Sequence, residues 1–245
     1  MAETVFFPGG RDARGTLDVA GARSASKSTN EAGEHAACVV ACPPHPQHGG
    51  NRTDERLRAV SEALSAEGVD CLRFDYGAWD GGRGERTDAL NAVDWAGERY
   101  DRIGLFGYSF GGTVALSAAA HGADVEATSA LAPPARIGTE RSAPDAPDDS
   151  DLGGIDVVAD LEELPTEIPG QVCYGSRDDV ADVIPVVEAA RERGYQVVEF
   201  AADHFFVGQA GTVAADVADF LAPPLHNEYS RLFPPSAANE SGARR

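Results

Sequence analysis

Short continuous runs of apolar residues alternate along this chain with segments whose apolar positions recur every three or four residues. Continuous runs are typical of strands buried on both faces of a sheet, and the wider spacing is typical of helices with one buried face. The runs predict strands at 3–7, 15–22, 36–42, 69–76, 102–107, 125–134, 169–176 and 195–201. The wider spacing predicts helices at 51–67, 88–100, 110–120, 183–194 and 212–222. This alternation predicts an α/β fold with a mostly parallel sheet and helices on both faces.

The remaining segments suggest how the chain is organised around that sheet. A turn-rich stretch separates the first two strands, which favours an antiparallel opening pair. Residues 137–156 are rich in Pro, Asp, Ser and Gly, so we expect a mobile acidic excursion there. Only the segment around 137–165 is long enough to cover a site, which predicts a minimal cap over an open cleft. We expect one domain over 1–221 and a flexible C-terminal tail over 222–245, because the tail has little apolar surface to bury.

The charge of the chain changes the list of plausible partners. It has 20 basic and 40 acidic residues, a net charge of −20, and Lys27 is its only lysine. Such a field repels nucleic acid and anionic membrane, so we expect neither as a partner. The acidic residues are spread along the chain, which favours a hydrated surface suited to concentrated salt over a docking face for a basic partner. The chain is rich in Asp and poor in Lys, and this composition resembles that of proteins from salt-loving archaea.

The cysteines and the N-terminal segment bear on redox state and location. Cys38, Cys42, Cys71 and Cys173 lie in or beside apolar runs, with spacings that match no zinc pattern, so we expect reduced core residues. No basic segment followed by an apolar run opens the chain, and no run is long enough to span a bilayer. We therefore expect a cytoplasmic protein.

One motif carries candidate chemistry. Gly107-Tyr108-Ser109-Phe110-Gly111 is a G-x-S-x-G sequence between a predicted strand and a predicted helix. In that position the glycines permit a sharp turn that exposes the central hydroxyl at the edge of the sheet. If Ser109 has no catalytic role, it merely caps the helix that follows it. The flanking strand and helix favour the interpretation of Ser109 as a nucleophile.

A serine nucleophile needs a base, and the base needs an acid. His204 follows the last predicted strand, and three carboxylates lie in suitable loops: Asp178, Asp179 and Asp203. The chain order nucleophile, acid, histidine is the one used by hydrolases of the G-x-S-x-G type. Asp203 is adjacent to His204, so its side chain should diverge from the ring. Asp178 and Asp179 both remain candidates on position alone.

An oxyanion formed at Ser109 would need two N–H donors. The amide of Phe110 is one candidate, and the loop after the third predicted strand supplies the other. In that loop, prolines carry no N–H, which leaves His45, then Gln47, then His48 as donors. The histidines of this loop lack a third ligand, so we expect no metal site and no cofactor.

The series PPHPQHGGN, LRFDY, GYSFGG, YGSRDD and ADHFF, spread over residues 1–221, resembles the α/β-hydrolase superfamily. The nearest branch is that of dienelactone-hydrolase-like and small carboxylesterase-like proteins. This resemblance implies an α/β-hydrolase fold, and the spacing Gly175-x-x-Asp178-x-Val180 matches its acid loop and implies Asp178 as the acid. Two features depart from the branch: Pro43 replaces a histidine, and the loop DYGAWDGGRG lacks the usual Arg and Ser. Dienelactone hydrolases proper use a cysteine nucleophile, so their activity is not implied here.

Together these features predict a serine hydrolase that cleaves a small carboxylic ester through an acyl-enzyme. Trp79, Phe110, Phe205 and Phe206 are candidates for the walls of the acyl pocket, although each could equally be core. Two alternatives remain open: a serine peptidase acting on short peptides, and a non-catalytic scaffold with a hydrolase-like fold. The oligomeric state stays undetermined at this stage.

Overall fold

Eight strands form one twisted sheet in the computed structural model, which describes residues 2–21, 37–138 and 154–226. The strands are β1 (Ala2–Phe6), β2 (Arg14–Asp18), β3 (Ala37–Cys42), β4 (Asp70–Asp75), β5 (Arg102–Tyr108), β6 (Ala127–Leu131), β9 (Gly170–Gly175) and β10 (Gln196–Phe200). Their order across the sheet is β1-β2-β4-β3-β5-β6-β9-β10. The pairs β1–β2 and β2–β4 are antiparallel and the other pairs are parallel, so both the mostly parallel sheet and the opening antiparallel pair are confirmed.

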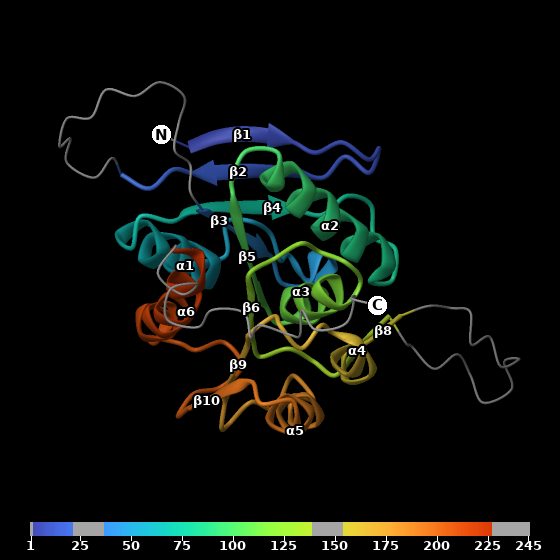
Figure 1. Cartoon of the computed structure of the whole chain (residues 1–245). Coiled ribbons are helices and arrows are strands. Elements are labelled where there is room, and N and C mark those ends of the chain that lie inside the picture. Colours follow the sequence, from blue (N-terminus) through green and yellow to red (C-terminus); the bar gives the residue numbers. More distant parts are fainter. Residues whose placement is uncertain (1, 22–36, 139–153, 227–245) are drawn as a thin grey trace, which may run out of the picture.

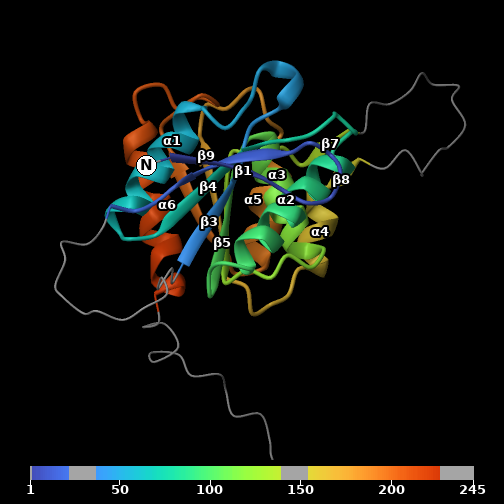
Figure 2. The same cartoon turned by 90° about the horizontal axis from the view of Figure 1, so that it is seen from above.

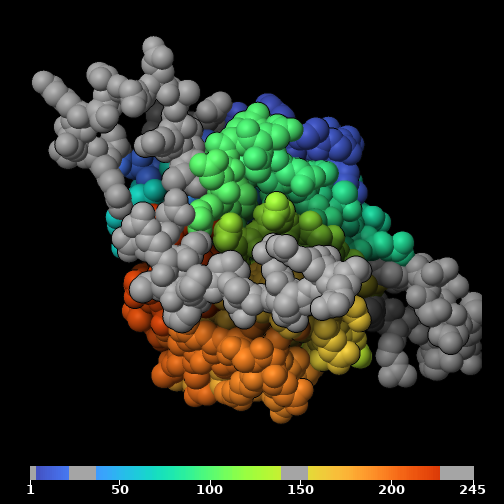
Figure 3. All heavy atoms as spheres, viewed as in Figure 1, coloured from blue at the N-terminus to red at the C-terminus, as the bar shows by residue number. Residues whose placement is uncertain are grey.

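Six α-helices within the described residues cover the two faces of this sheet. They are α1 (Glu55–Ala66), α2 (Arg83–Gly97), α3 (Phe110–Ala120), α4 (Val157–Glu163), α5 (Ile184–Glu192) and α6 (Ala210–Leu225). Helices α1 and α6 lie on one side, and α2, α3, α4 and α5 lie on the other, in both views of Figures 1 and 2. The first strand pair and α5 lie at opposite margins of the molecule (Figure 3).

The central strands are buried on both faces because helices cover them on both sides. All six residues of β3 and of β9 are buried, as the continuous apolar runs predict. The apolar residues form two clusters, one on each side of the sheet. On the α1–α6 side, Leu57 and Leu64 of α1 share a cluster with Val217 and Leu221 of α6. All four cysteines are buried and free, which confirms their predicted place in the core.

Four of the five predicted helices, α1, α2, α5 and α6, differ from their predicted bounds, and for two of them the structure shows why. Helix α2 begins at Arg83 rather than at residue 88, because Glu85 accepts the N–H of Gly82 and caps the first turn. Helix α6 continues to Leu225 through two prolines, beyond residue 221 where the domain was expected to end. Its last turn is stabilised because Arg102 donates to the carbonyl of Pro224 at 3.0 Å and Leu225 is buried.

The predicted acidic excursion is only partly described. Residues 139–153 lie outside the described residues, but both flanks are ordered as a short antiparallel sheet of β7 (Arg136–Ile137) and β8 (Ile155–Asp156). Helix α4 then contacts α3 and α5, so residues 157–163 belong to the helical layer and not to a cap. The C-terminal tail from residue 227 also lies outside the described residues.

No helix in the described part of the chain combines the length and apolar character that crossing a bilayer requires.

Candidate active site

Ser109 occupies the sharp turn between β5 and α3, at the carboxyl end of the sheet. Its backbone has φ 55° and ψ −123°, a left-handed conformation that few residues other than glycine adopt. The two glycines of the motif are required by space. A Cβ on Gly107 would overlap the carbonyl oxygen of Gly111, and a Cβ on Gly111 would overlap the carbonyl oxygens of Cys42 and Pro43. The turn therefore holds the partly exposed Ser109 against the loop that follows β3.

His204 reaches Ser109 from the loop after β10. Its Nε2 lies 3.0 Å from Oγ of Ser109, and only 4% of the residue is exposed. The loop is held from below, since the hydroxyl of Tyr108 donates to the carbonyl of His204 at 3.0 Å. Burial raises the pKa of Tyr108 to about 12, so this hydroxyl keeps its proton. Asp203 accepts the N–H of Phe205 at 3.0 Å and turns away from the ring, as its position in the sequence predicts.

Asp178 is the carboxylate that contacts the histidine. Its Oδ2 lies 2.8 Å from Nδ1 of His204, and its side chain is fully buried. The other oxygen, Oδ1, accepts the N–H groups of Val180 and Ala181, each at 2.9 Å. Asp179 is exposed on the same loop. The turn thus directs one of the two adjacent carboxylates at the imidazole and the other into solvent.

These contacts determine the tautomer of the neutral ring. An ionised carboxylate can only accept, so Nδ1 of His204 carries the proton in its bond to Asp178. Nε2 is then left with its lone pair toward Ser109, and the serine hydroxyl can donate to it. This is the arrangement that lets an imidazole take a proton from a serine hydroxyl.

The loop Pro43–Gly50 leaves one of its N–H groups available near this serine. Every N–H after His45 in the loop is used inside its own turn: Gln47 donates to Nδ1 of His45, His48 and Gly50 donate to the carbonyl of His45, and Gly49 donates to the carbonyl of Pro46. Three of the other positions are prolines. Among the described residues, the N–H groups of His45 and Phe110 have no hydrogen-bond partner. Of these two residues, Gln47 has its N–H bonded within the turn and His45 does not.

Comparison with known proteins identifies the fold. No family model and no curated protein matches the sequence. A serine hydrolase without a lid from Xanthomonas campestris is 21% identical, with 96% of each chain covered and a TM-score of 0.65. Est1E from Butyrivibrio proteoclasticus is 18% identical over 91% of this chain and 98% of its own, with a TM-score of 0.69. The dienelactone hydrolase of Anabaena variabilis is 19% identical over 90% and 96%, with a TM-score of 0.63.

The chain has the α/β-hydrolase fold. In this α/β-hydrolase fold, Ser109, Asp178 and His204 come from three loops at one edge of the sheet, after β5, β9 and β10. Carboxyl ends of parallel strands meet at a common edge, which is why residues so far apart in sequence converge there.

Four aromatic residues were candidates for pocket walls, and the structure separates them into two pairs. Phe110 and Phe206 are each 1% exposed and belong to the core, so the prediction that they line an open pocket is wrong for both. Trp79 is 37% exposed and Phe205 is 51% exposed. The Trp79 ring lies 5.6 Å from that of Phe110, and the Phe205 ring lies edge-on to His204 at 5.4 Å. The exposed pair therefore lies next to residues of the candidate site, Trp79 beside Phe110 and Phe205 beside His204.

Sequence reasoning missed two buried carboxylates, Glu85 and Asp88, which hold the loop that carries Trp79. Both side chains project from the first turns of α2 and are fully buried. Glu85 accepts the N–H groups of Asp80 and Gly82 in this loop at 2.9 and 2.8 Å, and Asp88 accepts the N–H of Gly77 at 2.9 Å. Asp88 also accepts from Nε of Arg11, which lies between β1 and β2, at 2.9 Å. The sequence contains one sign of this: glutamate stands three residues after Gly82, the spacing of a capping box.

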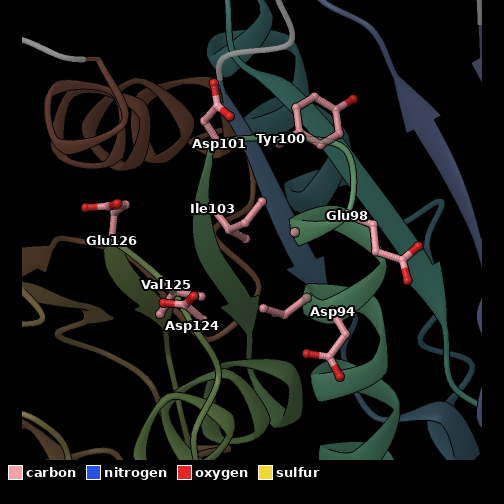
Figure 4. Close-up of a pocket in the computed structure, with 10 residues that line it drawn as sticks. Asp94, Glu98, Tyr100, Asp101, Ile103, Asp124, Val125 and Glu126 are labelled. Carbon is pink, nitrogen blue, oxygen red and sulfur yellow. The ribbon is translucent and has the colours of Figure 1, made fainter.

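A concave region lies at the edge of the sheet opposite Ser109. It has a volume of about 440 Å³ and lies between the end of α2 and the starts of β5 and β6 (Figure 4). Its carboxylates are all exposed: Asp94, Glu98, Asp101, Asp124 and Glu126. Within the ranges that the structure describes, no group of His, Cys, Asp and Glu side chains could hold a metal ion.

Proposed function

We propose that the protein is a serine hydrolase that cleaves a small carboxylic ester. One observation carries this proposal: a continuous chain of contacts joins Oγ of Ser109 to Nε2 of His204 at 3.0 Å and Nδ1 of His204 to Asp178 at 2.8 Å. The α/β-hydrolase fold is consistent with it, although fold alone does not specify chemistry.

In the first half-reaction, His204 takes the proton of the Ser109 hydroxyl while Oγ bonds to the ester carbonyl carbon. The electron pair of the carbonyl bond moves to its oxygen, and the N–H groups of Phe110 and His45 stabilise the resulting oxyanion. Collapse breaks the bond to the alcohol oxygen, which leaves with the proton from Nε2. Asp178 stabilises the imidazolium throughout and keeps its orientation.

In the second half-reaction, water replaces the alcohol. His204 takes a proton from the water as its oxygen bonds to the acyl carbon, and a second oxyanion forms in the same place. The bond to Oγ then breaks, Ser109 recovers its proton from Nε2, and the carboxylic acid is released. Every step uses groups of the chain and water, so the reaction proceeds without a cofactor.

The surroundings of Ser109 indicate the kind of substrate. Trp79 and Phe205 present exposed aromatic surface beside Phe110 and His204, which favours an ester with an apolar or aromatic portion. Est1E, which shares the fold, has been solved with ferulic acid bound. That observation on a similar structure is consistent with a small aromatic acyl group here.

The test is hydrolysis of a short p-nitrophenyl ester in concentrated KCl, comparing the wild type with Ser109→Ala. Removal of a working nucleophile should lower kcat by about four to six orders of magnitude. Covalent labelling by a fluorophosphonate, with the modified residue located by mass spectrometry, gives a second readout. We expect labelling of Ser109 in the wild type and none in the variant.

The outcomes separate the competing functions. Labelling of Ser109 together with turnover of a short peptide amide, but not of esters, would favour the peptidase. Absence of both labelling and turnover in a folded protein would favour a non-catalytic scaffold. Equal turnover by the wild type and Ser109→Ala would show that another residue is the nucleophile.

A further inference from the structure

The side chain of His45, in addition to its backbone N–H, takes part in the structure of the loop beside this site. The ring nitrogen Nδ1 accepts the N–H of Gln47 at 3.2 Å, two residues along the chain. The carbonyl of the same residue accepts the N–H groups of His48 and Gly50, each at 3.0 Å. All three bonds converge on His45, so this one residue organises the turn whose only free N–H is its own.

The ring is also packed from several directions. It stacks on His48 with centroids 4.4 Å apart, and lies 4.6 Å from the ring of Trp79 and 4.8 Å from that of Phe110. The last contact joins the loop to the residue directly after Ser109. A shift of this ring would therefore move the loop relative to the start of α3, where the other oxyanion donor lies.

We propose that the His45 side chain is a positioning residue for the oxyanion site: as a neutral acceptor for Gln47 it holds the backbone N–H of His45 toward Ser109. This inference rests on the proposed function. The imidazole acts through the backbone, and the N–H group is the part that would touch the reacting oxygen.

A neutral ring is essential to this role, because an imidazolium has no lone pair left to accept a hydrogen bond. Burial, and then the neighbouring His48, lower the pKa of His45 below its usual 6.5, so the ring is neutral at pH 7. His48 is the titratable group stacked on it, while the loop after β4 and helix α3 present the uncharged rings of Trp79 and Phe110. As the pH falls below 6.5, protonation should break the bond to Gln47 and disturb the turn.

Three substitutions of His45 separate the effect of its hydrogen-bond acceptor from the effect of its aromatic ring. His45→Asn keeps an acceptor in the same turn, as Asn51 does when its Oδ1 accepts the N–H of Thr53 at 2.9 Å. His45→Phe keeps a flat ring without an acceptor, and His45→Ala removes both. His48→Phe, which leaves the stacked ring and the backbone in place, is the matched control.

The measurement is ester hydrolysis by each variant, with kcat and KM determined separately and folding checked by thermal unfolding. We expect His45→Phe and His45→Ala to lower kcat about 10- to 100-fold with KM changed less than about threefold, because a misplaced donor loses stabilisation of the transition state. His45→Asn should stay within about threefold of the wild type, and His48→Phe within about twofold.

A pH profile adds a readout that a merely structural role would not change. In the wild type, protonation of His45 should contribute to the fall of kcat/KM at low pH. In His45→Asn that protonation is absent, so the fall should be less steep than in the wild type. This comparison uses only active proteins, so it holds even if His45→Phe fails to fold.

Each result decides the matter. Equal loss in all three His45 variants, or no loss in any, would overturn the positioning role, as would acid limbs of equal steepness in the wild type and His45→Asn. A wild type that neither hydrolyses esters nor reacts with a fluorophosphonate would overturn the proposed function itself, and the role of His45 with it. If the wild type is active and His45→Phe is unaffected, only the positioning role of His45 would be overturned, and the proposed function would stand.

Discussion

The two edges of the sheet carry carboxylates that differ in burial and in hydrogen bonding. At the carboxyl ends of the strands, Asp178 is buried and both its oxygens are used, one by His204 and one by two N–H groups. At the amino ends of β5 and β6, five carboxylates line an exposed hollow (Figure 4). Among the described residues there, Glu98 is paired with Arg99, and Asp94, Asp124 and Glu126 make no ion pair. A net charge of −20 therefore says little about any one acid; its bonding and burial determine its role.

The same contrast holds for helix α2, which reaches both regions. Its first turns bury Glu85 and Asp88 under the loop of Trp79, whereas Asp94 in its last turns, and Glu98 directly after it, are exposed to the hollow. Because identical residue types differ so much in surroundings, substitutions at the two edges should differ in size by orders of magnitude.

The largest difference is expected for Asp178→Asn. The variant cannot hold the proton on Nδ1 of His204 in the same way, so kcat should fall about 10⁴-fold with the fold intact. Asp179→Asn, on the same loop but exposed, should stay within about twofold. Ester hydrolysis and thermal unfolding measured side by side give the comparison. Similar losses in both variants would contradict the assignment of Asp178.

The next effect is on stability. Asp88→Ala leaves Nε of Arg11 and the N–H of Gly77 without their partner, and should lower the free energy of unfolding by about 3–5 kcal/mol. Burial raises the pKa of Asp88, so folding opposes its charge, and Asp88→Asn should cost less than Asp88→Ala. Asp94→Ala, on the exposed part of the same helix, should change stability by less than about 0.5 kcal/mol. Denaturant unfolding of the three variants is the measurement; a loss in Asp94→Ala as large as in Asp88→Ala would refute the contrast.

A smaller effect is expected at the exposed aromatic residues. Trp79→Ala and Phe205→Ala should each lower kcat/KM about tenfold for esters with an aromatic acyl group, and less than about twofold for acetyl esters. Phe6→Ala, which removes an aromatic residue that is 71% exposed on β1, should change neither rate. If both aromatic variants slow acetyl and aromatic esters equally, these side chains do not select the acyl group.

The smallest effect concerns the hollow. Neutralising Asp94, Asp124 and Glu126 together, as Asn, Asn and Gln, should raise the melting temperature by a few degrees at about 0.1 M salt, because like charges no longer repel. At about 1 M salt the difference should vanish, since the screening length falls to roughly 3 Å. Thermal unfolding across a KCl series measures both. A gain that persists in high salt would indicate that local packing, and not charge repulsion, is responsible.

Much of the fold was predictable because buried parallel strands consist of unbroken apolar runs. β3 and β9 are read directly from such runs, and α3 was predicted with its observed bounds. The errors fall where tertiary contacts override local preference. Two prolines suggest the end of α6, yet Leu225 is buried and the helix continues; the pairing of β7 with β8 depends on residues far apart in sequence.

The residue types and the chain order of the candidate site were predictable from the sequence, but the directions in which its side chains point were not. Ser109 could be identified from the glycine spacing, and His204 from its position after the last strand. Position and residue type alone leave Asp178 and Asp179 as alternatives, and only the family resemblance favours Asp178, because the turn decides which side chain points inward. The bond from Gln47 to His45, and the buried Asp88 beneath Trp79, depend on loop conformations that a one-dimensional pattern does not contain.

The position of α6 has a consequence for how the chain acquires its structure. This helix covers the face of the sheet that α1 shares, and Leu225 packs against Gly104 in the middle strand β5. Ribosomes make α6 after every strand of this sheet, so the part of that face that α6 covers stays open to solvent until α6 has been made. The nascent protein therefore displays an apolar surface that chaperones can bind until α6 emerges.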